Sequence, residues 1–259
     1  MPQQVQGLAE SSEGAAAALD RRLAEIAGLK ERLAEIGRIA PGPIGFSTSL
    51  GLEDQAILHG IAAAGAKIGV FTLDTGRLFP ETIETIARSE QRYGLSIRVV
   101  APEAVDVEAL VARDGVMGFR LSIEARQACC EVRKVRPLKR ALTGAGSWIT
   151  GLRRGQSAGR GSVPFAAWDA DYRLVKINPL ADWTLDRLEA YVAANDVPVN
   201  PLHAKGFPSI GCQPCTRAVR PGEDVRAGRW WWENEDGKEC GLHANPRRPP
   251  GQPVREAAE

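Results

Sequence analysis

The chain has 259 residues, 44% of them hydrophobic and 25% charged, with a formal net charge of +1. Such a composition is typical of a globular protein with a buried core, and it argues against nucleic-acid binding through bulk charge. No apolar run approaches the roughly 18 residues that a membrane helix needs. The first residues also lack the apolar core of a signal peptide, so we expect a cytoplasmic protein whose thiols are reduced.

The N-terminal region is expected to start with a disordered stretch over residues 1–14, which are polar and rich in Ala, Glu and Ser. One amphipathic helix is predicted to follow over Leu19–Ile36, because Leu and Ile recur there at helical spacing. Pro41 and Pro43 end it, because proline lacks a backbone donor. No motif covers this region. A simple packing helix is the favoured interpretation, and contacts in the homo-oligomer that we expect are the alternative.

Short apolar segments then alternate with helices along the chain. Strands are predicted at residues 44–46, 68–73, 95–100, 147–151 and 174–177, and helices at 53–64, from 80 onward, at 132–142 and at 182–195. Thr184 suits the cap of the last helix. This alternation predicts an α/β domain over residues 15–200, with a parallel sheet covered on both faces. Pro, Gly, Trp and Arg dominate beyond it, so residues 201–259 are expected to form an irregular C-terminal segment.

Polar loops follow three of the predicted strands, at residues 47–54, 74–79 and 151–160. Because the carboxyl ends of parallel strands meet at one edge of a sheet, these loops should lie together where ligands bind. Backbone N–H groups and Ser hydroxyls at a helix start, and the adjacent guanidinium groups of the third loop, suit phosphate or sulfate. Each loop alone is compatible with ordinary turn residues, and the first lacks a Walker sequence. Together the three favour a nucleotide-like anion.

Four of the five cysteines form two pairs, Cys129 with Cys130 and Cys212 with Cys215. Four thiols complete a tetrahedral metal or cluster site, provided that the fold brings the pairs together. Adjacent cysteines diverge on a helix, which suits an iron–sulfur cube better than one zinc ion. Zinc, a redox-active disulfide and simple burial as small apolar residues remain alternatives.

Positive charge is concentrated between Arg126 and Arg160, where there are nine Arg or Lys residues and one acid. A solvated basic face explains this stretch as well as an anion pocket does. Lys134 comes one helical turn after the Cys129–Cys130 pair, so its ammonium group could lie near a negatively charged cluster. An ordinary surface lysine is the alternative interpretation.

The fifth cysteine, Cys240, has no internal partner once the other four are committed. Nearby cations lower the pKa of a thiol and raise its thiolate fraction. His243 lies three residues further on and could act as a charge partner or an acid–base group, unless it is a capping or packing residue. Arg226 and Arg229 precede Cys240 in the same segment. This concentration of reactive residue types indicates thiol catalysis.

Seven motifs resemble those of the assimilatory adenylyl-sulfate (APS) reductases, which form one superfamily with the phosphoadenylyl-sulfate (PAPS) reductases and are related to the ATP pyrophosphatases. The motifs run from about Ile44 to His243 and include every cysteine. They are FSTSLGLEDQ (46–55), LDTGRL (73–78), CCEVRK (129–134), GLRRGQS (151–157), GCQPC (211–215), GRWWWE (228–233) and ECGLH (239–243).

The resemblance implies an adenine nucleotide alpha hydrolase-like (ATP pyrophosphatase-like) fold. It also implies a [4Fe–4S] cluster, whose ligands would be Cys129, Cys130, Cys212 and Cys215. PAPS reductases that lack the cluster cysteines share the ECGLH motif, so these four residues favour APS as the substrate. PAPS reductase, and a zinc-stabilised nucleotide-binding module without turnover, are the alternatives.

The reaction that the resemblance implies is the reduction of adenosine 5′-phosphosulfate to sulfite and AMP, in sulfate assimilation and cysteine biosynthesis. Cys240 would be the nucleophile and would form an enzyme S-sulfocysteine, with His243 as its catalytic partner. Thioredoxin or glutaredoxin would then release sulfite, because no resolving cysteine remains in the chain.

The resemblance also assigns substrate-binding residues. Those that would meet the nucleotide are Ser47, Ser49 and Gly51, with Leu73 and Gly151 acting through their backbones. Those that would hold the phosphosulfate are Arg154, Arg160, Arg226, Arg229 and His243. Lys134 would couple cluster and substrate electrostatically.

Overall fold

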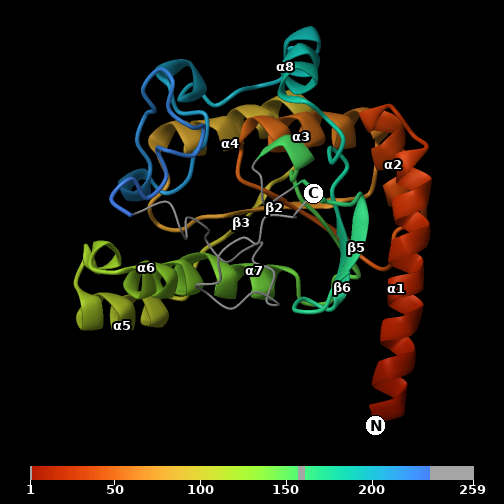
Figure 1. Cartoon of the computed structure of the whole chain (residues 1–259), viewed down its shortest axis with the longest axis horizontal. Helices are drawn as coiled ribbons and strands as arrows, with labels where there is room; N and C mark the ends of the chain where they lie inside the picture. The colour runs from red at the N-terminus through yellow and green to blue at the C-terminus, as the bar shows by residue number, and fades with distance from the viewer. Residues whose placement is uncertain (1, 157–160, 234–259) are drawn as a thin grey trace, which may run out of the picture.

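The computed structural model describes residues 2–156 and 161–233, and its centre is a six-stranded sheet (Figure 1). The strands are β1 (Ile44–Thr48), β2 (Gly69–Leu73), β3 (Arg98–Val100), β4 (Ser147–Ile149), β5 (Ala166–Asp169) and β6 (Leu174–Ile177). Their order is β3-β2-β1-β4-β6-β5, and every neighbouring pair is parallel except β5 with β6. The predicted α/β fold with a mostly parallel sheet is therefore confirmed.

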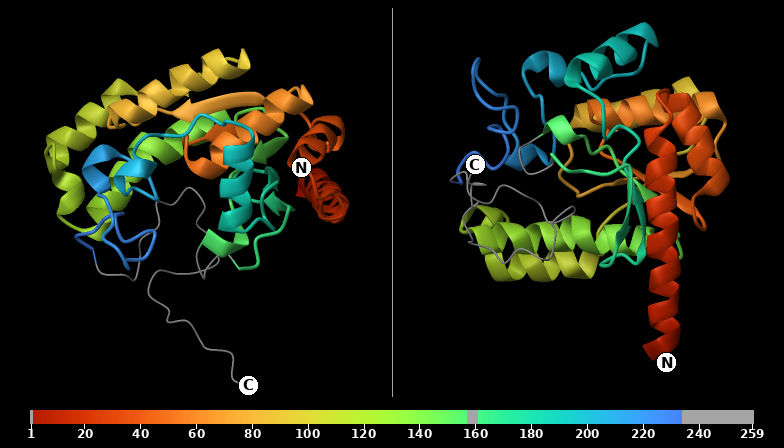
Figure 2. Two further views of the ribbon diagram at one scale, coloured as in Figure 1. Left: turned by 90° about the horizontal axis from the view of Figure 1, so that it is seen from above. Right: turned by 45° about the vertical axis from the view of Figure 1, so that its right-hand side comes forward.

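Eight α-helices surround this sheet in the described part of the chain. They are α1 (Pro2–Ala24), α2 (Leu29–Ile39), α3 (Leu52–Ala64), α4 (Pro80–Tyr93), α5 (Ala104–Asp114), α6 (Ile123–Cys130), α7 (Arg136–Ala141) and α8 (Leu185–Ala194). Helices α3, α4 and α8 lie on one side of the sheet and α5, α6 and α7 on the other (Figures 1 and 2). None of these described helices is both long and apolar enough to cross a membrane.

The N-terminal region differs from the prediction in two ways. Helix α1 begins at Pro2, within the stretch of residues 1–14 that is expected to be disordered. Ala16, Leu19 and Leu23 are buried, and a helix fixed by that burial extends readily through an Ala-rich stretch. The single helix predicted over 19–36 is instead two, α1 and α2, separated by a break before the extended cap at Gly28.

The outer edge of the sheet was not predicted from the sequence. Strand β5 pairs antiparallel with β6 and forms a hairpin across residues 170–173. Helix α1 packs along it, and Asp20 Oδ1 accepts hydrogen bonds from the N–H groups of Phe165 (2.7 Å) and Ala166 (3.1 Å). The N-terminal helix thus covers an edge strand that would otherwise expose unpaired backbone groups.

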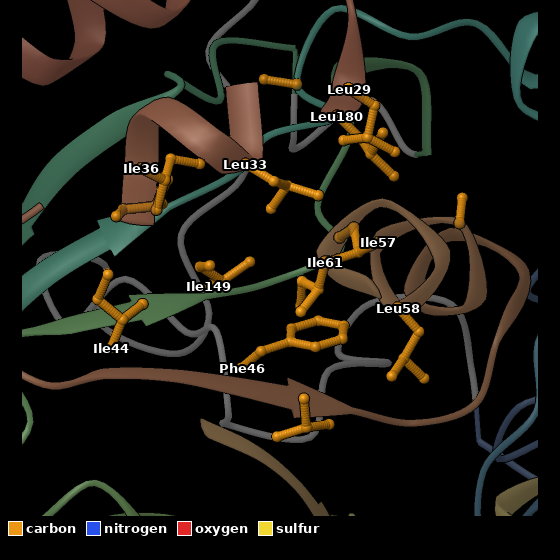
Figure 3. Packing of buried hydrophobic residues seen from close by; sticks show 14 of the residues in the cluster. Leu29, Leu33, Ile36, Ile44, Phe46, Ile57, Leu58, Ile61, Ile149 and Leu180 are labelled. Carbon is orange, nitrogen blue, oxygen red and sulfur yellow. The ribbon is translucent and has the colours of Figure 1, made fainter. Parts of the chain in front are cut away.

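The main core fixes the central strand under helix α3. Phe46 of β1 is fully buried, and Figure 3 shows it beside Ile57 and Ile61 of α3 and Ile149 of β4. Burial of each such side chain stabilises the fold by about 1.5–3 kcal/mol. This packing holds the first turn of α3 at the carboxyl edge of β1.

Helices α6 and α7 form one continuous helical segment with a π-helical turn, η2 (Glu131–Val135), between them. The helix predicted to start near residue 132 therefore starts at Ile123, where Ser122 Oγ accepts the N–H of Ala125 (3.1 Å). Pro137 follows the π turn and lacks the donor that a regular helix would need there. A widened turn immediately after the Cys129–Cys130 pair is the result, and such turns are common at functional sites.

Residues 201–233 contain only short turns, among them η5 (His203–Lys205) and η6 (Gln213–Cys215), and an isolated bridge between Thr216 and Arg229. This segment lies beside α6 at one end of the molecule (Figure 2).

Candidate active site

A cavity of about 860 Å³ opens at the carboxyl edge of β1, β2 and β4. Eight of the eleven residues expected to act on the substrate line it, namely Ser47, Ser49, Gly51, Leu73, Lys134, Gly151, Arg226 and Arg229. Arg154 is not among its lining residues, and Arg160 and His243 lie outside the described residues. The fold therefore brings three sequence-distant loops to one place, as the parallel sheet predicts.

The first loop is held in an unusual backbone conformation. Leu50 has φ 59°, a left-handed conformation that non-glycine residues rarely adopt, and its N–H donates to Thr48 Oγ1 (3.0 Å). Strain of this kind is concentrated at functional sites. The turn leads directly into the start of α3 at Leu52, where unpaired backbone N–H groups favour an anion.

Asp54 organises the same loop from within α3. Its Oδ2 atom accepts hydrogen bonds from the N–H (2.6 Å) and Oγ (2.7 Å) of Ser49. Burial raises the pKa of Asp54 to about 6, although both Ser49 hydrogen bonds act in the opposite direction. A Cβ atom on Gly151 would lie 2.3 Å from Asp54 Oδ1, so the third loop can approach α3 this closely only with glycine.

Ser47 is oriented by a tryptophan that sequence reasoning did not single out. Trp148 of β4 is buried, lines the cavity, and donates from Nε1 to Ser47 Oγ (2.8 Å). Because the serine oxygen accepts this bond, its own proton is directed elsewhere. Nothing in the local sequence distinguishes this Trp from any other strand residue, since the contact depends on the pairing of β1 with β4.

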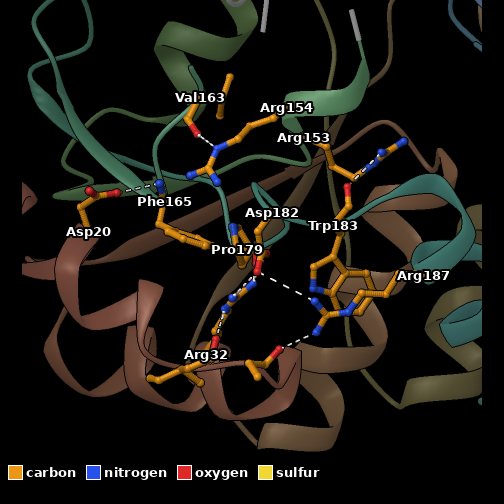
Figure 4. Close-up of polar contacts among 12 residues, drawn as sticks. Asp20, Arg32, Arg153, Arg154, Val163, Phe165, Pro179, Asp182, Trp183 and Arg187 are labelled. Atoms are coloured by element: carbon orange, nitrogen blue, oxygen red, sulfur yellow. Dashed lines mark hydrogen bonds and ion pairs between the residues drawn. The ribbon is translucent and has the colours of Figure 1, made fainter. Parts of the chain in front are cut away.

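The two adjacent arginines of the third loop have different roles. Arg153 is buried, lines the cavity, and donates from Nε (2.9 Å) and Nη2 (2.8 Å) to Glu53 Oε1. Arg154 instead donates from Nε to the carbonyl of Val163 (2.9 Å) and lies 5.3 Å from the ring centre of Phe165, as Figure 4 shows. Consecutive side chains on a short turn diverge. The expectation that Arg154 holds the phosphosulfate is not supported, and Arg153 occupies the cavity wall in its place.

The four paired cysteines lie behind this cavity and come together. Cys129, Cys130, Cys212 and Cys215 are all buried and free of disulfides. Cys215 interacts electrostatically with the other three, so the two pairs converge although they are far apart in sequence. Cys129, Cys212 and Cys215 pack in a small apolar cluster with Phe119 and Trp230. Across residues 2–156 and 161–233, no group of three or more His, Cys, Asp or Glu side chains is arranged to hold a single metal ion.

The thiols differ in their charge environment. Burial raises the pKa of Cys215 to about 12. Burial also tends to raise the pKa of Cys212, but other groups outweigh it and the pKa of that thiol is lowered. These groups are the Lys134 ammonium, a hydrogen bond with Thr75 Oγ1 (3.3 Å) and nearby arginines. Lys134 both interacts with these thiols and lines the cavity, so it lies between the cysteines and the expected substrate site.

Arg229 closes the cavity from the C-terminal segment. It is buried, donates from Nη1 to Ser209 Oγ (3.3 Å), and lies 4.8 Å from the ring centre of Trp230. A Cβ atom on Gly211 would lie 2.3 Å from its guanidinium, so the residue before Cys212 must be small. The arginine is thereby held against the cysteine loop.

The described chain ends with an anchored residue. Glu233 forms a buried ion pair with Arg126 of α6, with 2.7 Å between Oε1 and Nε. Just before it, Trp230 has φ 43° and donates its N–H to the carbonyl of Cys215 (3.1 Å). Cys240 and His243, the expected catalytic residues, lie outside the described residues.

Comparisons with known proteins agree with this arrangement. The chain matches the phosphoadenosine phosphosulfate reductase domain family over residues 43–218. It is 54% identical over 229 residues to the adenosine 5′-phosphosulfate reductase of Agrobacterium fabrum, which covers 88% of this chain and 86% of the relative. It is 52% identical over 214 residues to the protein of that name from Allochromatium vinosum, with 82% and 84% covered.

A solved structure supports the fold independently. The phosphate complex of PAPS reductase from Candida auris matches with a TM-score of 0.66 and 24% identity, over 79% of this chain and 96% of that one. At this identity the similarity establishes the fold alone, and it is consistent with the adenine nucleotide alpha hydrolase-like architecture expected from the motifs.

Proposed function

The chain belongs to the phosphoadenosine phosphosulfate reductase family, and from this premise we propose that it reduces adenosine 5′-phosphosulfate to sulfite and AMP in sulfate assimilation. The observation that carries the proposal is the shared cavity: eight of the eleven expected substrate residues line it, and so does Cys212 of the cysteine site. Its volume of about 860 Å³ falls within the range of ligand pockets, about 300–1,000 Å³.

The loops supply the binding chemistry. Ser47, Ser49 and the start of α3 offer hydroxyl and N–H donors to the nucleotide, and Leu73 and Gly151 offer backbone groups to its adenine or ribose. Arg226 and Arg229 form the cationic wall that faces these loops and would hold the phosphosulfate.

Cys240 carries the covalent step in this proposal. Its thiolate attacks the sulfur of the phosphosulfate, an S–S bond forms, and the S–O bond breaks with its electron pair leaving on AMP. A thiolate of an external dithiol protein then attacks Cys240 Sγ and displaces sulfite, which leaves with the S–S electron pair. The second thiol of that protein resolves the mixed disulfide and frees Cys240. His243 is the proposed charge partner of the thiolate.

The four buried cysteines are suited to hold a [4Fe–4S] cluster. They provide four thiolates, three of which, Cys129, Cys212 and Cys215, lie in an apolar cluster. Lys134, Arg77 and Arg133 interact electrostatically with thiols of the set. A bound cluster would supply structural support and a negative charge behind the substrate site. Lys134 is the residue through which that charge would reach the substrate.

The decisive experiment is anaerobic turnover with APS and reduced thioredoxin. We expect Cys240→Ser to abolish sulfite release while the protein still binds AMP, because only the nucleophile is removed. Sulfite production at the wild-type rate by this variant would contradict the mechanism. The ratio of kcat/KM for APS and PAPS, measured on the same preparation, distinguishes the PAPS reductase alternative.

The metal alternative is tested on the same preparation. A thiolate-bound iron–sulfur cluster absorbs broadly near ~400 nm. Colourless protein that contains zinc and no iron would favour the zinc-stabilised binding module. A cytoplasmic location and a homo-oligomeric state remain predictions, to be tested by fractionation and by sedimentation.

A further inference from the structure

An exposed apolar patch lies next to the cysteine site, and the reaction above does not use it. We call it the exit patch, and its members are Val116, Met117, Leu121, Ile123 and Trp231. Leu121 is 77% exposed and Val116 65%, although both are large apolar side chains. Clusters of this kind are uncommon on the free surfaces of monomeric proteins and mark interaction sites.

Polar contacts fix the exit patch to the cysteine loops. Arg120, in its middle, donates from Nη2 to the carbonyl of Pro214, between Cys212 and Cys215 (3.3 Å). The same guanidinium lies 5.3 Å from the ring centre of Trp231, which joins the two segments of the patch. Arg77, in the loop after β2, donates to the carbonyl of Val116 (2.7 Å). The patch is therefore a preformed surface attached to the site.

The chain leaves the described structure beside this patch. Glu233, two residues after Trp231, is held by its buried ion pair with Arg126 of α6. Cys240 comes seven residues after this anchor, and seven extended residues span at most about 25 Å. The chain length therefore sets an upper limit on the distance between Cys240 and the Glu233 anchor.

We propose that the exit patch is the docking surface for the dithiol protein that reduces the S-sulfocysteine at Cys240. This inference rests on the proposed function and names the surface that its partner uses. The four other cysteines are buried, so the reducing thiols must come from outside the described site. An incoming dithiol protein has to approach within reach of the Glu233 anchor, and among the described residues the exit patch is an exposed apolar surface beside that anchor.

The chemistry constrains the partner to thioredoxin-type proteins rather than small thiols. One partner thiolate forms a disulfide with Cys240 Sγ as sulfite leaves, and the second thiol closes the partner's own disulfide. Only a macromolecular partner gains affinity from a docking surface. A small dithiol such as dithiothreitol carries out the same exchange without contacting the exit patch.

The test separates docking from chemistry by single turnover. Holoenzyme variants Met117→Glu and Leu121→Glu, singly and together, are loaded with stoichiometric APS, and the AMP burst is measured without reductant. Sulfite release is then followed after mixing with reduced thioredoxin, and in parallel with dithiothreitol. The control is Ile39→Glu at the end of α2, an exposed apolar residue on a helix that lies on the other side of the molecule from α6 (Figure 1).

We expect an unchanged AMP burst, an unchanged dithiothreitol rate, and a thioredoxin rate at least about tenfold lower, equivalent to 1.4 kcal/mol. Ile39→Glu should leave all three unchanged. A thioredoxin rate equal to wild type would overturn the proposal. So would a parallel fall in the dithiothreitol rate, or a loss of self-association in sedimentation, which would assign the patch to a second copy of this chain. Wild-type protein without an AMP burst would refute the proposed function itself.

Discussion

Two ion pairs that involve residues of the C-terminal segment allow the effect of burial on stability to be separated from the effect of distance. Arg126 with Glu233, and Arg217 with Glu223, both have 2.7 Å between nitrogen and oxygen. The side chains of the first pair are only 1% and 5% exposed, whereas those of the second are 33% and 28% exposed. Equal distances with unequal burial make Glu233→Gln and Glu223→Gln a matched comparison.

Glu233→Gln leaves the Arg126 guanidinium buried opposite a neutral group. Removing one partner of a buried pair typically costs about 3–5 kcal/mol, because the remaining buried charge is no longer compensated by the opposite charge. At roughly 2–4 °C per kcal/mol for a chain of this size, the apparent Tm should fall on the order of 10 °C. Water already solvates the Arg217–Glu223 pair, so Glu223→Gln should change Tm little.

The assay is thermal unfolding of anaerobically prepared holoenzyme at matched iron content. A third variant, Arg126→Met with Glu233→Leu, should recover part of the lost stability, because no buried charge remains without a partner. The reasoning is refuted if Glu233→Gln and Glu223→Gln shift Tm equally, or if the double replacement is no better than the single one.

Two further predictions concern the cavity wall. Burial raises the pKa of Asp54 to about 6. Between about pH 4 and 6 the native state therefore keeps a proton that the unfolded state releases. The free energy of unfolding falls as the pH rises through that range. Urea titrations of wild type and Asp54→Asn give the unfolding free energy of each protein. The wild-type value minus the Asn value should decrease by up to about 3 kcal/mol between pH 4 and 7. An increase in this difference would contradict the prediction. Arg153→Ala leaves Glu53 without its guanidinium partner and should weaken AMP binding, measured by calorimetry, about tenfold or more, which corresponds to 1.4 kcal/mol. Arg154→Ala should change AMP binding little, because that side chain donates to the carbonyl of Val163. If Arg154→Ala weakened binding more than Arg153→Ala, the original assignment of Arg154 would be restored.

The sequence by itself determined the parts of this protein that depend on local spacing. Alternating strands and helices placed β1, β2 and β4 and the loops that follow them, because strand termini in a parallel sheet share one edge. The resemblance carried by motifs at those termini identified part of the cavity lining, including Ser47, Leu73 and Gly151. The arithmetic of the five cysteines separated a set of four from Cys240.

Tertiary structure alone decided the features that depend on distant partners. Arg153 turns toward the cavity because it pairs with Glu53, whereas Arg154 bonds to the carbonyl of Val163. Two identical neighbouring residues do not show in the sequence which of them faces the cavity. Trp148 reaches Ser47 only because β4 pairs with β1. The convergence of the two cysteine pairs likewise needed the fold. Periodicity records which face of an element is buried, but it contains no information about the partner that buries it.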